Sequence, residues 1–277
     1  MHTIITNMHF ENKVVWIIGA SSGIGAALAK QFAREKALLI ITARNTDKLQ
    51  SLANELTQLT TCVVLPADIA RRDTLHSIVE DSLRQFGHID ILIHSAGIGQ
   101  RSMAADTSLA VYDQLMAVNF FAPLTITQYL LPHFKQSGKG HIVAVSSMSG
   151  LMGFPGRSGY VASKHALKGY FETLQVEHDI PDFYITIISP GRINTPLPLS
   201  ALTADGQPYN KMDHAQLNGI PVEVCAEKIC DAIIRKKKHI FIARKERYLY
   251  WLRILFPAAY YRIARKAGIK ERNTDTL

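Results

Sequence analysis

The chain has 277 residues, 47% of them hydrophobic, and a formal net charge of +8. This length and apolar content suffice for one substantial core, so we expect one domain rather than several. The charge is uneven, because residues 235–272 hold thirteen Lys or Arg against two Glu, whereas residues 1–234 hold eighteen basic and twenty acidic residues.

The N-terminal segment, MHTIITNMHFENK, has no basic region leading into an apolar one, so we expect no secretory signal. Cys62, Cys225 and Cys230 lack the paired C-x-x-C spacing of zinc sites, and they do not suggest a disulfide framework. We therefore expect buried thiols, no metal ion and a cytoplasmic location.

Short apolar runs alternate with helix-length amphipathic segments along most of the chain. Strands that are apolar on both faces belong to a parallel sheet covered on both sides, so the pattern predicts an α/β, doubly wound (Rossmann) domain over residues 1–243. The first helix is predicted at 23–37, and no repeat or linker divides the domain. Seven parallel strands are expected, at 13–20, 38–44, 61–68, 89–97, 141–147, 183–191 and 239–243.

A glycine-rich turn follows the first predicted strand and leads into the first helix. Glycines allow a tight turn and the close approach of a pyrophosphate to a helix N-terminus. Glycines also permit an ordinary strand-to-helix turn, so the motif alone does not separate the two interpretations. The predicted cofactor-binding residues of this turn are Gly19, Ser21, Ser22, Gly23, Ile24 and Gly25.

The ends of the second and third predicted strands carry residues that distinguish the nicotinamide cofactors. Arg44, with Lys48 one helical turn later, suits the 2′-phosphate of NADP, whereas an acidic residue there would favour NAD. Arg44 could equally be solvated surface. Asp68 could accept a hydrogen bond from the adenine amino group, or it could cap the following helix.

Tyr160 and Lys164 stand four residues apart in SGYVASKHALKGY, which reads as the start of a helix. Residues at i and i+4 share a helical face, so the phenol and the ammonium can act on the same small volume. A lysine charge about 4 to 5 Å away would lower the pKa of the phenol from about 10 toward 7, which suits general acid–base catalysis. Alone, the pair is best interpreted as exposed helix surface; Ser147 and the glycine turn favour a catalytic site.

In this order, over roughly residues 10 to 245, these motifs resemble those of the short-chain dehydrogenase/reductase family. The family's Y-x-x-x-K is Tyr160 to Lys164, its serine is Ser147 in IVAVSSMSG, and its helix asparagine is Asn119 in AVNFFAP. The resemblance implies that Ser147 binds the substrate oxygen, that Asn119 holds a water that passes protons to Lys164, and that Lys164 holds the nicotinamide ribose. It also implies cofactor contacts from Ala96, Gly97, Tyr160, Lys164, Pro190, Gly191, Ile193 and Thr195.

Within the family, the run LTADGQPYNKMDHAQLNGIPVEV (202–224) is similar to the branch of dehydrogenase/reductase member seven B and the 11β-hydroxysteroid dehydrogenase-like enzymes. The implied activity is reversible hydride transfer between NADPH and a lipophilic ketone or secondary alcohol of steroid or acyl-lipid type, with Tyr160 as general acid or base. The alternative is a non-catalytic NADP-binding regulatory or scaffold protein on the same fold. Such proteins typically lose the tyrosine or the lysine, and this chain keeps both.

Two positions depart from the family pattern. His94-Ser95 replaces the two asparagines that usually precede Ala96-Gly97, and Ile18 replaces the threonine that usually precedes the first glycine. We expect altered local stability rather than lost activity, with His94 as a structural substitute rather than a catalyst.

Residues 192–220 form a long irregular segment, which in a compact domain usually has a function. We expect this segment to cover the substrate, with an apolar lining from Leu197, Leu199, Leu202 and Met212, although such residues more often simply pack a loop. The family resemblance further implies a homo-oligomer, a dimer or tetramer, formed through the helices that bear Asn119 and Tyr160.

Residues 244–277 lie beyond the last predicted strand and read as a basic amphipathic helical extension with a break at Pro257. No uncharged run in it approaches the length of a membrane span. Trp, Tyr and arginines on one helix suit an anionic membrane surface, so we predict peripheral membrane contact through 244–270. Packing on the catalytic domain or across a subunit interface explains the same pattern. The region has no recognised nucleic-acid-binding fold, and we expect no nucleic-acid partner.

Overall fold

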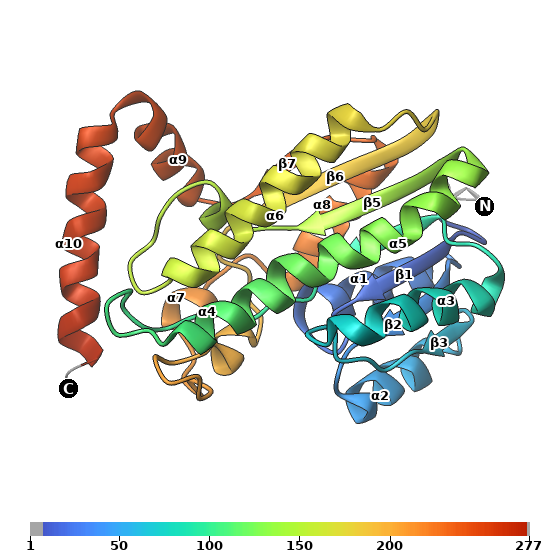
Figure 1. Cartoon of the computed structure of the whole chain (residues 1–277), viewed down its shortest axis with the longest axis horizontal. Coiled ribbons are helices and arrows are strands. Elements are labelled where there is room, and N and C mark those ends of the chain that lie inside the picture. Colours follow the sequence, from blue (N-terminus) through green and yellow to red (C-terminus); the bar gives the residue numbers. More distant parts are fainter. Residues whose placement is uncertain (1–7, 276–277) are drawn as a thin grey trace, which may run out of the picture.

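A single seven-stranded parallel sheet forms the centre of the protein, in the order β3-β2-β1-β4-β5-β6-β7 (Figure 1). The computed structural model describes residues 8–275; residues 1–7 and 276–277, parts of the predicted signal-free N-terminus and of the C-terminal extension, lie outside it. The predicted doubly wound α/β fold is confirmed. The strands are β1 (Val14–Ile18), β2 (Leu38–Thr42), β3 (Cys62–Val64), β4 (Ile91–His94), β5 (Lys139–Val145), β6 (Asp182–Pro190) and β7 (His239–Ile242).

Helices cover both faces of the sheet, which explains why its strands are apolar on both sides. Val14, Trp16 and Ile18 of β1 pack into one core, and the alternate residues Val15 and Ile17 pack into the other. The first core is closed by α3 (Leu75–Phe86), α4 (Leu109–Met116), α5 (Ala122–Ser137) and α6 (Ser158–Glu177). The second is closed by α1 (Gly23–Arg34), α2 (Thr46–Leu56) and α8 (Val222–Ile234).

Helices α4 and α5 are joined by a turn of π-helix, η2 (Ala117–Phe121), and together run from Leu109 to Ser137. By length and composition this stretch could cross a membrane, but core helices pass the same test, and much of it packs in the first core. The remaining short elements are η1 (Arg72–Thr74), η3 (Met148–Gly150), η4 (Leu197–Ser200) and α7 (His214–Leu217).

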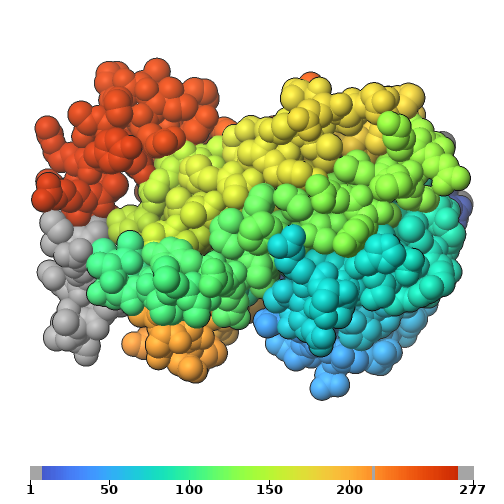
Figure 2. All heavy atoms as spheres, in the orientation of Figure 1, coloured from blue at the N-terminus to red at the C-terminus, as the bar shows by residue number. Residues whose placement is uncertain are grey.

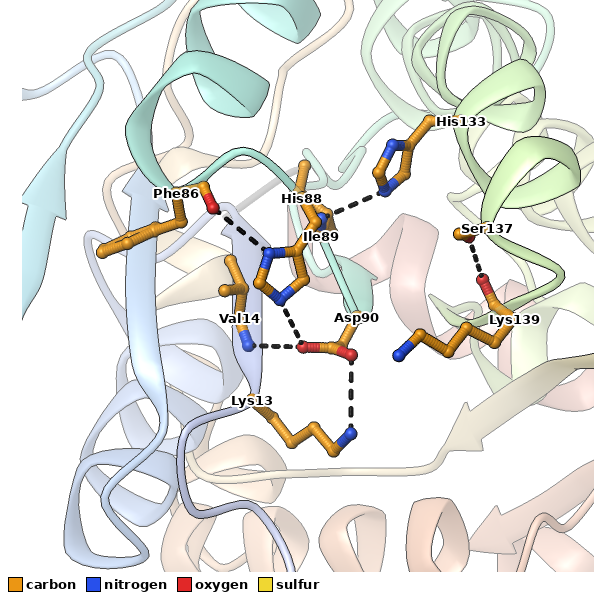
Figure 3. Close-up of polar contacts among 9 residues, drawn as sticks. All are labelled: Lys13, Val14, Phe86, His88, Ile89, Asp90, His133, Ser137 and Lys139. Carbon is orange, nitrogen blue, oxygen red and sulfur yellow. Dashed lines mark hydrogen bonds and ion pairs between the residues drawn. The ribbon is translucent and has the colours of Figure 1, made fainter.

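Asp90 links β1 and β4 at the end of the sheet where both strands begin, opposite their carboxyl ends (Figure 3). Its carboxylate accepts a hydrogen bond from the backbone N–H of Val14 at 2.9 Å, and lies 3.5 Å from Lys13 Nζ and 3.3 Å from His88 Nε2. Next to it, the backbone N–H of Ile89 donates to Nε2 of His133 on α5. This cluster fixes the register of the two central strands.

The C-terminal extension forms two helices, α9 (Glu246–Leu255) and α10 (Pro257–Asp275), which stand at one end of the molecule (Figures 1 and 2). One side packs on the loop after β5. Arg253 Nη1 donates a hydrogen bond to the carbonyl oxygen of Leu151 at 2.7 Å, and the hydroxyl of the buried Tyr260 donates one to the carbonyl oxygen of Gly153. The other side leaves apolar residues exposed, namely Tyr248, Trp251, Ile254, Leu255, Phe256, Tyr261 and Ile263. Packing on the catalytic domain therefore accounts for only one side of the extension.

Candidate active site

A cavity of about 440 Å³ lies at the carboxyl ends of the central strands, where ligands bind in doubly wound folds. Among the predicted catalytic and cofactor-binding residues, only Gly25 and Asn119 do not line it. Those that line it are Gly19, Ser21, Ser22, Gly23, Ile24, Arg44, Asp68, Ala96, Gly97, Ser147, Tyr160, Lys164, Pro190, Gly191, Ile193 and Thr195. The topology thus brings together residues that are up to 176 positions apart in the sequence.

The glycine turn is shaped by close backbone approach. Gly19 has φ +92°, and a Cβ there would lie 2.4 Å from the backbone nitrogen of Ala96. A Cβ at Gly25 would lie 2.2 Å from the carbonyl oxygen of Gly19, so Gly25 lets α1 start directly against the turn instead of lining the cavity. The cavity therefore meets the N-terminus of α1, where free N–H groups attract an anion.

The wall formed by the ends of β2 and β3 suits the adenosine end of a dinucleotide. Arg44, Asn45 and Lys48 all line the cavity, and Asn45 caps α2 by accepting a hydrogen bond from the Lys48 backbone N–H at 2.8 Å. Asp68 also lines the cavity, and its carboxylate accepts from the Ala70 N–H at 3.1 Å. The glycine turn, the helix N-terminus and these polar side chains together fit a nicotinamide dinucleotide.

Tyr160 is half-buried on α6 and lines the cavity together with Ser147, which follows β5. Burial raises the pKa of Tyr160 above its ordinary value, and this outweighs the opposing effects of Ser147, Arg157 and Arg101. The expectation that this pKa is lowered toward 7 is wrong for this structure. The phenol is therefore protonated at neutral pH.

Lys164 lies beside Tyr160, with its Nζ 5.9 Å from the centre of the tyrosine ring. The lysine side chain is buried, and its ammonium donates to the carbonyl oxygen of Val145 at 3.0 Å. Burial lowers the pKa of Lys164 to about 8, because an ammonium loses hydration there.

Asn119, in the π-helical turn, is fixed by three side-chain hydrogen bonds. Its Oδ1 accepts from the backbone N–H of Ile98 at 2.9 Å, and its Nδ2 donates to the Ile98 carbonyl oxygen and to Ser163 Oγ. A Cβ on Gly97 would lie 3.2 Å from Asn119 Oδ1 and 3.3 Å from Lys164 Nζ. Asn119 thus holds the loop after β4 against the helix that carries Tyr160.

His94, at the end of β4, is a structural residue, as expected. It is buried, its Nε2 lies 2.9 Å from Thr127 Oγ1 on α5, and burial lowers its pKa to about 3. The imidazole is therefore neutral and links β4 to the helix that covers it. Ile18 is buried in the first core.

A second cavity of about 210 Å³ adjoins the first, and the two share Ser147, Tyr160, Pro190, Gly191, Leu197 and Gln216. The predicted apolar lining is only partly correct: Leu199 lines the first cavity, Leu202 is buried in the core, and Met212 lines neither. The sequence reasoning missed most of the residues that do line the second cavity, which combine apolar and charged side chains. They include Gln100, Arg101, Met148, Phe154, Arg157, Asp213, Lys245, Glu246 and Leu249.

Comparisons with known proteins agree with this geometry. The family model described as short chain dehydrogenase matches residues 13–204. Dehydrogenase/reductase SDR family member 7B of Danio rerio is 36% identical over 276 residues, which cover 96% of this chain and 89% of the relative. A short-chain dehydrogenase from Sphingobium yanoikuyae, solved in complex with NADPH, has a TM-score of 0.73 at 27% identity and covers 83% of this chain and 87% of its own. An alcohol dehydrogenase from Thermococcus sibiricus, complexed with 5-hydroxy-NADP, has a TM-score of 0.71 at 26% identity, with 83% and 95% covered.

Proposed function

The chain belongs to the short-chain dehydrogenase/reductase family, and from that membership we propose that it reduces a lipophilic ketone with NADPH, reversibly. The observation that carries the proposal is the position of Ser147 and Tyr160 together in a wall shared by the cofactor cavity and the second cavity. A carbonyl placed there would have a proton donor on one side and the cofactor cavity on the other.

Each polar residue of this wall has a distinct part in the proposed reaction. Tyr160 gives its phenolic proton to the carbonyl oxygen, Ser147 donates a hydrogen bond to the same oxygen, and Lys164 holds the nicotinamide ribose hydroxyls. NADPH, when bound, supplies the hydride. Because burial raises the pKa of Tyr160, the phenol is protonated at neutral pH, which is the form that the proposed reduction requires.

The preference for NADPH over NADH is proposed from Arg44 and Lys48. Both line the cavity at the end of β2, where the 2′-phosphate of NADP would lie. A lipophilic substrate of steroid or acyl-lipid type is proposed from Met148, Phe154 and Leu249, which line the second cavity. The charged residues of that cavity would contact a polar part of the same molecule.

A panel of ketones tested with NADPH and with NADH examines this proposal. We expect turnover of apolar ketones with NADPH, and a loss of about 10³-fold in Tyr160→Phe with unchanged NADPH affinity, since one oxygen is removed. Tyr170→Phe on the same helix is the matched control, because Tyr170 lines neither cavity. Full activity in Tyr160→Phe, or a preference for NADH or for small polar sugars, contradicts the proposal.

We further propose a cytoplasmic homo-oligomer that binds membranes peripherally through 244–270. The exposed apolar residues Trp251, on α9, and Phe256, between α9 and α10, support the membrane contact. The basic residues Arg247 on α9 and Arg262 and Arg265 on α10 support it too. A dimer or tetramer through α5 and α6, next to Asn119 and Tyr160, rests on the family resemblance.

A further inference from the structure

The side chain of Gln100 is almost fully enclosed, with 1% of the residue exposed, in the loop that follows β4. No sequence motif pointed to it. Its side chain nevertheless makes several polar contacts. Through them, Gln100 connects its own loop, which also lines the cofactor cavity, to the helix that carries Tyr160.

The amide oxygen of Gln100 caps the N-terminus of α6. Oε1 accepts hydrogen bonds from the backbone N–H groups of Gly159 at 2.7 Å and of Tyr160 at 3.2 Å. The first N–H groups of a helix have no partner within the helix, and the residue before α6, Arg157, provides no side-chain cap. A residue 59 positions away in the sequence therefore supplies the missing acceptor.

The amide nitrogen of Gln100 has its own fixed partners. Nε2 donates to Thr107 Oγ1 at 3.0 Å and lies 3.2 Å from Ser102 Oγ, and these two hydroxyls are 2.7 Å apart. If the amide were turned over, its NH₂ group would face the backbone N–H groups of Gly159 and Tyr160, and donors would then face donors. The two hydroxyls and the helix therefore specify one orientation of the amide.

The loop that carries Gln100 is fixed at a second point. Asn119 holds both backbone groups of Ile98, and Gly97 forms the wall of the cofactor cavity beside Lys164. Gln100, two residues beyond Ile98, therefore links this wall to the first turn of α6 through its hydrogen bonds.

We infer that Gln100 is a positioning residue for catalysis: it holds the backbone of Tyr160 at a fixed place relative to the nicotinamide side of the cavity. The inference rests on the proposed function, because it concerns the reach of the Tyr160 hydroxyl toward the carbonyl oxygen. Small misplacements of a proton donor are costly; a displacement of about 1 Å can lower a rate about 10²-fold.

The test compares three variants. Gln100→Leu removes the acceptor and the donor, whereas Gln100→Glu keeps an acceptor for the α6 N–H groups. Gln175→Leu is the matched control, since Gln175 Nε2 donates to the carbonyl oxygens of Ile185 and Lys238 from the far end of the same helix. For each variant, kcat, KM, NADPH affinity, melting temperature and hydrogen exchange of the peptide at 158–161 are measured.

In Gln100→Leu we expect kcat to fall about 10²-fold with NADPH affinity unchanged within twofold, and exchange at 158–161 to rise at least tenfold. Gln100→Glu restores at least a tenth of the wild-type kcat, and the added negative charge shifts the pH profile of kcat to higher pH. Gln175→Leu lowers the melting temperature without changing kcat.

Two results overturn the inference: a wild-type kcat in Gln100→Leu, or equal losses of kcat in Gln100→Leu and Gln175→Leu that follow their melting temperatures. A wild-type protein without turnover on any ketone contradicts the proposed function instead. Hydrogen exchange then still decides whether Gln100 fixes the backbone of Tyr160, and unchanged exchange in Gln100→Leu refutes it.

Discussion

Lys164 donates its ammonium hydrogen bond to the carbonyl oxygen of Val145, the last residue of β5, at a distance of 3.0 Å. The lysine thus ties α6 to the strand that leads into Ser147. Its charge is enclosed by protein, which is why burial lowers the pKa of Lys164 to about 8.

This burial predicts a rise of stability in alkaline solution. The pKa of Lys164 falls from 10.5 to about 8 on folding, so between these pH values the folded protein has lost a proton that the unfolded chain retains. The cost of burying the ammonium is fully present below about pH 8 and disappears as the pH approaches 10.5, a gain of roughly 3 kcal/mol for the wild type. Urea unfolding of wild type and Lys164→Met at pH 7, 8.5 and 10 measures the difference, and parallel curves would refute the prediction.

Arg44 is predicted to decide between the two cofactors. Removing a charge-assisted hydrogen bond to a phosphate costs about 1.5–3 kcal/mol, so Arg44→Ala should weaken NADPH binding about 10- to 100-fold. NADH lacks the 2′-phosphate, and its affinity should change less than twofold. Fluorescence titration with both cofactors measures this, with Arg34→Ala, exposed at the far end of α1, as the control. Equal losses for both cofactors would show that Arg44 does not contact the 2′-phosphate.

Gly19 is predicted to be required for space as well as for backbone conformation. Gly87 also has a left-handed conformation, φ +75° against +92° for Gly19, but an added Cβ there meets nothing within 4 Å. Gly87→Ala should therefore cost about 1 kcal/mol through conformation alone, whereas Gly19→Ala also forces Ala96 away. We expect a larger drop in melting temperature and loss of NADPH binding only in Gly19→Ala. Equal changes of melting temperature and NADPH binding in both variants would show that Gly19 is not required for its close approach to Ala96.

Asp90 is predicted to affect stability without affecting catalysis. Asp90→Ala leaves the Val14 N–H without its acceptor and removes the partner of Lys13 and His88, at a cost of about 1–3 kcal/mol. The cluster lies at the edge of the sheet opposite the cavity, so kcat and KM should remain those of the wild type. Thermal unfolding and steady-state kinetics check the two halves of this prediction separately, and a changed kcat would contradict it.

The exposed side of α9 is predicted to bind anionic vesicles. Truncation after Ala243 would also remove Arg253 and Tyr260, which hold the loop after Ser147, so point variants give the sharper test. The double variant Trp251→Ser and Phe256→Ser should reduce co-sedimentation with anionic vesicles at low salt, while NADPH affinity stays the same. Leu59→Ser, at an exposed apolar position distant in sequence from the extension, is the control. Wild-type protein that stays in the supernatant at low and high salt would refute membrane binding.

The strands and most lining residues of the cofactor cavity could be predicted because they follow from local patterns. Apolar runs mark strands, and a parallel sheet brings the carboxyl ends of those strands together. Gly19, Arg44 and Asp68 therefore line one cavity, as their positions after predicted strands indicate. Gln100 and Leu249 could not be found this way. Each reaches the site through a contact between distant segments, and neither residue type nor spacing distinguishes them from ordinary polar or apolar residues.

The direction of the Tyr160 pKa shift shows a second limit. A spacing of four residues predicts that Lys164 is near, which is correct, but it contains no information on how much water either group retains. Desolvation is a property of the whole surrounding fold, and here it outweighs the neighbouring charges.

The contacts of Arg253 and Tyr260 with the loop at 151–153 have a consequence for the order of synthesis. A ribosome has already produced the entire sheet, the glycine turn and Ser147 when these two residues are still unmade. The nascent chain can therefore form its nucleotide-binding half before Arg253 and Tyr260 contact the loop beside Ser147. A message cut short between codons 244 and 252 would yield a chain that contains every catalytic residue and lacks both of these anchors.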